Sequence, residues 1–323
     1  MPIPVPRKAI AVLLAAIALV AGGNTAAAIS RAQFPIQSMG DRGIDVIALQ
    51  HLLRARGRAT PVNGFFGSDT RAALTSWQTS VGQGGNGVAN VSTWERLVPE
   101  LRQGDSGEAV LALKKELNAK YGAGLDSSSI FDAPTRNAVQ SFQRHVGLPA
   151  GGVVDRNSWR NLVWHFMRPE FSRASLCNYN GGSNRADWGT GSTIAHLQAA
   201  ADLFRGRAGG VVAIGDISFE HGGEINLHAT HEHGLDIDIA LIRTDGRQCS
   251  HPGISYRSGR YDRADTRQLL RAIHDTLGGH LKLIYFNDPQ MIREGLSRRR
   301  ANHDDHIHVR LCEPGHAKSI YRC

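Results

Sequence analysis

The chain has 323 residues, which exceeds the usual size of one domain and predicts two or three. Its formal net charge is +8, from 37 Lys and Arg against 29 Asp and Glu. No nucleic-acid-binding motif accompanies this charge, so it favours contact with an anionic cell wall or membrane surface, although solubility alone would also account for it.

The N-terminus has the features of a cleaved secretory signal. Arg7 and Lys8 precede an apolar run over 9–21, and a small-residue A-x-A site ends at Ala28. An apolar run of 13 residues is shorter than the roughly 20 that a membrane-spanning helix needs, which disfavours an anchor. We therefore predict a signal peptide over 1–28 and an exported protein of the periplasm or the extracellular cell wall.

The segment over 40–98 is repeated over 104–163. Three blocks match in order, namely G-D-R-G (40–43) with G-D-S-G (104–107), FGSDTRAALTSWQ (66–78) with FDAPTRNAVQSFQ (131–143), and Trp94 with Trp159. The offset changes from 64 to 65 after the first block, which indicates one inserted residue. The chain thus contains two copies of one unit.

Each copy is predicted to be a small helical unit. The apolar positions of the first two helices follow helical spacing, in the sets Val46, Leu49, Leu53 and Ala73, Trp77, Val81 of the first copy, and Val110, Leu113, Leu117 and Ala138, Phe142, Val146 of the second. Pro134 falls in the first turn of its helix, where its missing N–H costs little. A short final helix follows in each copy, with Trp94 in the first, and we expect the aromatic residues in the core rather than on a ligand-binding surface.

These blocks resemble the three-helix peptidoglycan-binding domain, with its G-D-x-G-x-x-V-x-x-L opening and its F-[GD]-x-x-T-x-x-A-[VL]-x-x-[FW]-Q block. The resemblance implies two all-α wall-binding domains without catalysis, over 36–100 and 101–165. The first copy departs from the pattern in its glycine-rich loop over 82–86.

The composition changes after about Phe166. Most histidines and all four cysteines lie in this part, which we expect to form an α+β domain over 170–323 around a small antiparallel sheet. The cysteine spacing fits no four-thiolate zinc site, and export favours two disulfides. Three pairings are open for the cysteines, which are Cys177, Cys249, Cys312 and Cys323.

Two segments of this domain are predicted to be half-buried strands with polar sides. Because side chains alternate along a strand, Asp236 and Asp238 share one face in LDIDI over 235–239, and His306 and His308 share one face in HIHV over 306–309. Paired strands would place two imidazoles and two carboxylates in one pocket. His231, on the turn before the first strand, could complete it, and Gly234 would permit a close backbone approach.

Imidazole and carboxylate are typical ligands of catalytic zinc, which keeps three protein ligands and a water position. Zinc would polarise a carbonyl group and activate water, and an unliganded histidine could take the proton near neutral pH. The competing interpretation is an adventitious metal-binding patch of His228, His231 and His233.

These segments resemble the penicillin-insensitive murein endopeptidases, within the lysostaphin-like and D-Ala-D-Ala metallopeptidase group. The resemblance is carried by G-D-I-S (215–218), H-x6-D (231–238), G-L-D-x-D (234–238) and H-D-D-H-I-H-V-R (303–310). The chain departs from the family in F-E-H-G-G-E (219–224), after Ser218, and in having only four cysteines.

By position, the resemblance implies zinc ligands at His231, Asp238 and His308. His306 and His303 would activate water or stabilise the oxyanion. His228 would lie behind a ligand or contact substrate. Asp236 would orient a ligand imidazole, with the alternative that it replaces Asp238 as ligand.

The sequence therefore predicts an exported zinc-dependent endopeptidase that cuts a stem-peptide or cross-bridge bond of peptidoglycan. Peptidoglycan would be its substrate and anchoring surface, and we expect a monomer that contacts neither nucleic acid nor, after signal cleavage, membrane. The alternatives are a D-Ala carboxypeptidase of the same group and a non-catalytic wall-binding protein.

Overall fold

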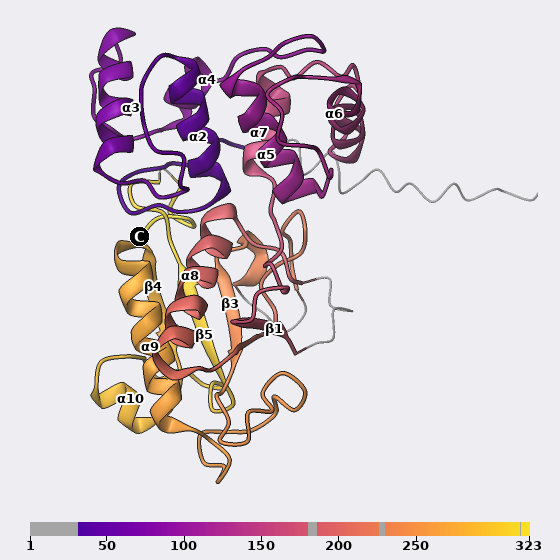
Figure 1. Cartoon of the computed structure of the whole chain (residues 1–323). Coiled ribbons are helices and arrows are strands. Elements are labelled where there is room, and N and C mark those ends of the chain that lie inside the picture. The colour runs from indigo at the N-terminus through magenta and orange to yellow at the C-terminus, as the bar shows by residue number, and fades with distance from the viewer. Residues whose placement is uncertain (1–31, 180–185, 226–229, 317) are drawn as a thin grey trace, which may run out of the picture.

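The computed structural model describes residues 32–179, 186–225, 230–316 and 318–323. The helices of the two repeats lie together at one end of the molecule, and a domain of helices and strands lies at the other (Figure 1). The predicted signal peptide over 1–28 lies outside the described residues. Within the described ranges, no helix is long and apolar enough to cross a membrane.

Each repeat forms three helices, as predicted. The first helical unit contains α2 (Ile44–Ala55), α3 (Ser68–Ser80) and α4 (Val91–Leu97). The second contains α5 (Glu108–Tyr121), α6 (Ala133–His145) and α7 (Arg156–Trp164). Pro134 lies in the first turn of α6, and the Asp132 side chain caps this helix by accepting a hydrogen bond from the backbone N–H of Thr135.

A buried glutamine in each unit shows why the second sequence block ends in Gln. The Gln78 side-chain amide donates to the backbone carbonyl of Val88 at 2.9 Å and to the Thr93 hydroxyl at 3.1 Å. Gln143 makes the equivalent bonds in the second unit, at 2.7 Å and 3.0 Å. Each glutamine thus ties the second helix of its unit to the start of the third.

The two units share one hydrophobic core, because α2 packs against α5. Trp94 and Trp159 are fully buried in it, and Trp77 and Phe142 are nearly so. The prediction that these aromatic residues pack in the core is confirmed.

The C-terminal domain contains a five-stranded sheet with the strand order β1-β2-β3-β5-β4. The strands are β1 (Leu176–Asn178), β2 (Val212–Ile214), β3 (Asp236–Ala240), β4 (Leu281–Tyr285) and β5 (His306–Leu311). The helices are α8 (Gly191–Ala208), α9 (Arg263–Leu277) and α10 (Pro289–Arg293). The predicted fold class, helical units followed by an α+β domain, is confirmed.

The expected antiparallel sheet is in fact mixed. The central pairs β2–β3, β3–β5 and β5–β4 are antiparallel, but β1 pairs with β2 in parallel. A parallel pair needs a long crossover, and the 18-residue helix α8 supplies it between these two strands. Each of these two strands is only three residues long, which is too short for a sequence pattern to indicate a parallel pair.

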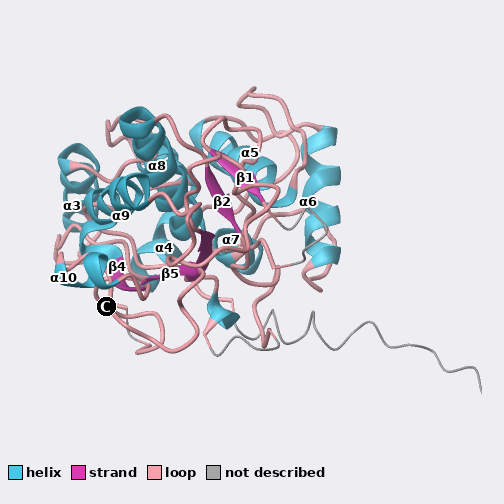
Figure 2. Cartoon of the chain, turned by 90° about the horizontal axis from the view of Figure 1, so that it is seen from below, coloured by secondary structure: helices cyan, strands magenta, loops and turns pink. Residues whose placement is uncertain are grey.

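The two faces of the sheet differ in character. Ile237 and Ile239 of β3, with Ile307 and Val309 of β5, belong to the core that α8 and α9 complete. Figure 2 shows these two helices side by side on one side of the strands. The predicted alternation therefore turns the aspartates of β3 and the histidines of β5 to the opposite face.

Two disulfides select one of the three pairings left open. Cys177 of β1 is bonded to Cys249, and Cys312 at the end of β5 is bonded to Cys323. The first closes a loop with a sequence separation of 72, for which the chain-entropy description gives a stabilisation of roughly 4 kcal/mol.

Charged side chains join the first helical unit to the C-terminal domain. Asp41 lies 3.3 Å from His280 Nε2, and an alanine Cβ at Gly43 would come within 2.8 Å of Ala195 in α8.

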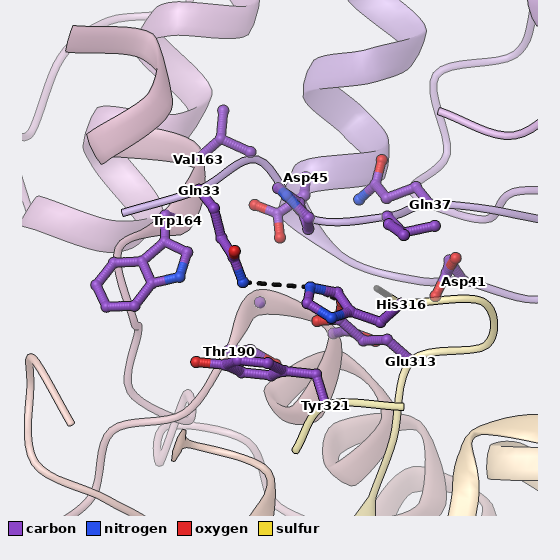
Figure 3. Close-up of a pocket in the computed structure, with 14 residues that line it drawn as sticks. Gln33, Gln37, Asp41, Asp45, Val163, Trp164, Thr190, Glu313, His316 and Tyr321 are labelled. Carbon is purple, nitrogen blue, oxygen red and sulfur yellow. Dashed lines mark hydrogen bonds and ion pairs between the residues drawn. The ribbon is translucent and has the colours of Figure 1, made fainter. Parts of the chain in front are cut away.

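Between the domains lies a small cavity of about 30 Å³, lined by Asp45, Trp164, Glu313 and other side chains (Figure 3). This volume admits a water molecule but no substrate.

Glu313, in the wall of this cavity, should make stability depend on pH. Burial, together with the nearby carboxylates of Asp41 and Asp45, raises the pKa of Glu313 to about 8. The folded state holds the Glu313 proton more tightly than the unfolded chain does. The free energy of unfolding is therefore higher at low pH, and it falls as pH rises from about 4.5 to about 8.

Glu313→Gln should remove this fall in the free energy of unfolding with rising pH. The variant should match the wild type near pH 5 and exceed it at pH 8, with a gain of at most about 1.4 kcal/mol for each pH unit in the window. Urea unfolding at several pH values measures the difference. Glu100→Gln, at an exposed position, is the control, and equal slopes for Glu313→Gln and the wild type would contradict the assignment.

Candidate metal centre

The pairing of β3 with β5 places a carboxylate opposite an imidazole. Asp238 and His308 are direct cross-strand partners, and Asp236 is opposite Arg310. The Asp238 and His308 side chains lie on the polar face of the sheet, 6% exposed each. A register shift of one residue would move both to the apolar face, so the isoleucine packing behind the strands fixes their position.

His231 reaches the same point from a short 3-10 helix (His231–His233) that precedes β3. The turn ends at Gly234, whose φ of +67° is unfavourable for residues with a Cβ. An alanine Cβ there would lie 2.8 Å from the Phe166 ring and 3.0 Å from the Thr190 nitrogen. The close approach predicted for Gly234 is therefore present, although it is to Phe166 and Thr190.

Three donor atoms converge. His231 Nε2 is 3.4 Å from Asp238 Oδ1 and 3.3 Å from His308 Nδ1, and His308 Nδ1 is 2.9 Å from the same Asp238 oxygen. One donor atom from each of these residues lies within 4.8 Å of the others, as a shared metal ion requires. Two nitrogens and one oxygen are the donor types that zinc takes in catalytic sites.

The remaining nitrogen of each imidazole has its own partner. His231 Nδ1 donates to the backbone carbonyl of Ile217 at 2.8 Å, and His308 Nε2 donates to Asp236 Oδ1 at 3.0 Å. Such partners fix the ring orientation of metal-binding histidines. Asp236 thus lies behind His308, while Asp238 lies beside the nitrogens that face the centre.

The two carboxylates determine the charge of His308. Burial alone would lower its pKa, but hydrogen bonds with Asp236 and Asp238 outweigh burial and raise the pKa to about 9. For Asp238, burial would raise the pKa, but hydrogen bonds from His231 and His308 hold it well below its usual range. The centre therefore favours a cation next to an ionised Asp238.

His306 and His303 lie at the open side of the centre. His306 is 26% exposed in its side chain, with Nε2 3.9 Å from Asp238 Oδ1 and Nδ1 2.9 Å from Asp305 Oδ1. His303 donates from Nδ1 to the Ala301 carbonyl at 2.7 Å, and its ring centroid is 4.7 Å from that of His306. Burial lowers the pKa of His303, so its ring is neutral near pH 7.

The G-D-I-S segment supports the centre through its backbone. Gly215 N–H donates to the Asp238 carbonyl, and Asp238 N–H donates to the Asp216 carbonyl. The carbonyl of Ile217, in the same segment, holds His231. These bonds give the segment a physical role that the motif alone did not reveal.

Sequence reasoning missed three residues at this centre. Asp305 holds the Nδ1 of His306, and the Tyr285 ring stacks on His308 with centroids 5.9 Å apart. Burial and the charge of Asp238 raise the pKa of Tyr179. Asp305 adjoins His306 in sequence and could have been noticed, whereas no local signal connects either tyrosine with the centre.

The other two histidines near β3 have different positions. His228 lies outside the described residues. His233 packs its ring against Tyr321, with centroids 5.5 Å apart. Within the described ranges, His231 is therefore grouped with the sheet residues rather than in a patch with His233.

Three stretches of the chain match known protein families. Residues 42–97 and 106–162 each match the putative peptidoglycan-binding domain, and residues 181–268 match the penicillin-insensitive murein endopeptidase family. The last region contains His231, Asp236 and Asp238, while His308 joins them from β5, beyond the matched residues.

A relative from Kitasatospora aureofaciens, described as an uncharacterized protein in the bpoA1 3' region, is 43% identical over 65 residues. That stretch is 20% of this chain and 55% of the relative. The chain therefore spans about half the length of this relative.

The turn at Gly234 can be tested by stability. Gly234→Ala combines a left-handed backbone, which costs about 1–2 kcal/mol, with contacts to Phe166 that require a shift. Gly246→Ala is a matched control, because Gly246 has φ +66° and no atom within 4 Å of an added Cβ. We expect Gly234→Ala to unfold at the lower temperature in calorimetry, and equal losses in the two variants would show that Gly234 is not closely packed.

Proposed function

Because the chain carries two putative peptidoglycan-binding domains and a penicillin-insensitive murein endopeptidase domain, we propose that it is an exported zinc-dependent peptidoglycan endopeptidase. It would hydrolyse a peptide bond in the stem peptide or the cross-bridge of the wall. The convergence of His231, Asp238 and His308 is the observation on which the proposal depends.

The donor set fits zinc. Two imidazoles and one carboxylate match a catalytic zinc site in number and type, and each imidazole has the outer partner that such ligands take. When bound, zinc supplies Lewis acidity, which polarises the scissile carbonyl and lowers the pKa of water. Asp236 would act as the positioning residue for His308.

The neighbouring histidines would handle the proton and the developing charge. His306 has a solvent-accessible ring next to Asp238, and Asp305 holds its Nδ1, so its Nε2 is directed to accept a proton from the attacking water. His303 donates its Nδ1–H to the Ala301 carbonyl, so its ring would have to take up a second proton, at Nε2, before it could donate a hydrogen bond to the oxyanion.

The two helical units, which we assign to 36–100 and 101–165, would hold the enzyme at the wall. Binding there raises the effective concentration of the substrate for the domain that we assign to 170–323, without contact to the scissile bond. The protein would work as a monomer, and the signal over 1–28 would direct its export.

Mass spectrometry of digested peptidoglycan tests the reaction. We expect cross-linked dimers to fall to monomers. Loss of single alanines would support a D-Ala carboxypeptidase instead, and intact muropeptides with fully zinc-loaded protein would support a non-catalytic wall-binding protein. His308→Ala should lose zinc from this centre and the hydrolytic activity together. Cleavage by that variant would overturn the ligand set.

The two aspartates of β3 should differ in their effect on zinc affinity. Asp238→Asn removes a ligand and should lose the metal, whereas Asp236→Asn leaves the three ligands in place and should weaken binding by about 10–100-fold. Competition with a zinc chelator measures both affinities. The opposite order would show that Asp236, rather than Asp238, is the ligand.

A further inference from the structure

A second group of three imidazoles and one carboxylate lies where the second helical unit meets the C-terminal domain. His145 is the last residue of α6, and His165 follows α7 directly. Glu220 and His221 belong to the C-terminal domain, in the segment over 219–224 where the chain departs from the family pattern.

The four side chains point at a common centre. Glu220 Oε1 is 3.0 Å from His145 Nε2 and 3.7 Å from His165 Nε2, and Glu220 Oε2 is 3.9 Å from His221 Nε2. One donor atom from each residue lies within 4.8 Å of the others. The three ring centroids are 5.2–5.6 Å apart, so all three imidazoles surround the one carboxylate.

His165 is the most informative member. Its Nδ1 donates to the Phe166 carbonyl at 2.7 Å, so its lone pair is on Nε2. That nitrogen is buried and has no hydrogen-bond partner among the described residues. Leaving a buried acceptor unsatisfied costs about 1–3 kcal/mol, and a cation at the centre of the group would satisfy it.

The protonation states also suit a metal. Burial lowers the pKa of His165 to about 3 and lowers that of His221, so both rings are neutral near pH 7. Burial would raise the pKa of Glu220, but the hydrogen bond from His145 outweighs burial and lowers it. An ion pair of Glu220 with His145 alone would leave His165 Nε2 unexplained.

We propose that His145, His165, Glu220 and His221 bind a second zinc ion, which joins the second helical unit to the C-terminal domain. Three nitrogens and one carboxylate oxygen complete a tetrahedron, so the ion would be structural, with no position left for substrate. The side chains of His145, Glu220 and His221 are 29%, 31% and 21% exposed, which gives the ion a path from solvent.

Such an ion would also support the wall of the first centre. The segment that carries Glu220 and His221 begins after Ile217, whose carbonyl holds His231. Within it, the Gly223 N–H donates to the Glu232 carbonyl at 3.0 Å. Fixing this segment against α6 would therefore orient the wall-binding units relative to the His231 turn.

Metal content of the full-length protein, measured after dialysis against a zinc buffer, tests the proposal. We expect His145→Asn and His221→Asn each to lose one zinc equivalent relative to the wild type. Glu220→Gln, which keeps the size of the side chain, should do the same. His251→Asn changes an exposed histidine outside the group and should lose none. Unchanged zinc in the first three variants would overturn the site.

The His308→Ala background separates the two centres. In that background zinc should still raise the melting temperature, and the rise should vanish when either His145→Asn or His221→Asn is added. Because these residues belong to different domains, a rise that survives His145→Asn but not His221→Asn would disprove the bridge. Failure of the proposed hydrolytic function would leave this result unaffected, since no readout here is activity.

Discussion

The cross-strand pair of Asp238 and His308 is the constraint on which the rest of the candidate centre depends. Its position follows from the β3–β5 register, which is held by Ile237, Ile239 and the other apolar side chains that pack against α8 and α9. The hydrophobic core thus determines the chemistry on the opposite face. A register shift of one residue would bury the aspartates among isoleucines, which would disrupt both the core and the polar site. His231 and the G-D-I-S backbone are then arranged around this pair.

In both histidine groups, a hydrogen bond to a backbone carbonyl orients one imidazole ring. His231 and His165 each donate Nδ1 to a backbone carbonyl, which leaves Nε2 directed at the other donors. The groups differ in the number of donors. The first has three and an open side next to His306, as catalysis at a metal requires, whereas the second has four and joins two domains.

The repeats show how one sequence motif serves two structural contexts. Gly43 and Gly107 occupy equivalent positions with φ of +113° and +112°. A Cβ added at Gly43 would come within 2.8 Å of Ala195 in α8, while nothing lies within 4 Å of a Cβ added at Gly107. The first unit thus docks on the C-terminal domain through its motif, and the second through His145 and His165. The motif by itself determines only the turn.

The sequence by itself determined what depends on local periodicity: the helices of the repeats, the strands of the H-x-H and D-x-D segments, and the polar face that they share. The tertiary structure decided the choice of Asp238 over Asp236 as neighbour of the two imidazoles, the disulfide pairing, the parallel β1–β2 pair and the second histidine group. These features join residues far apart in the chain, such as His145 and Glu220 at a separation of 75. Spacing along a chain carries no information about such contacts, because they form only when separate cores pack together.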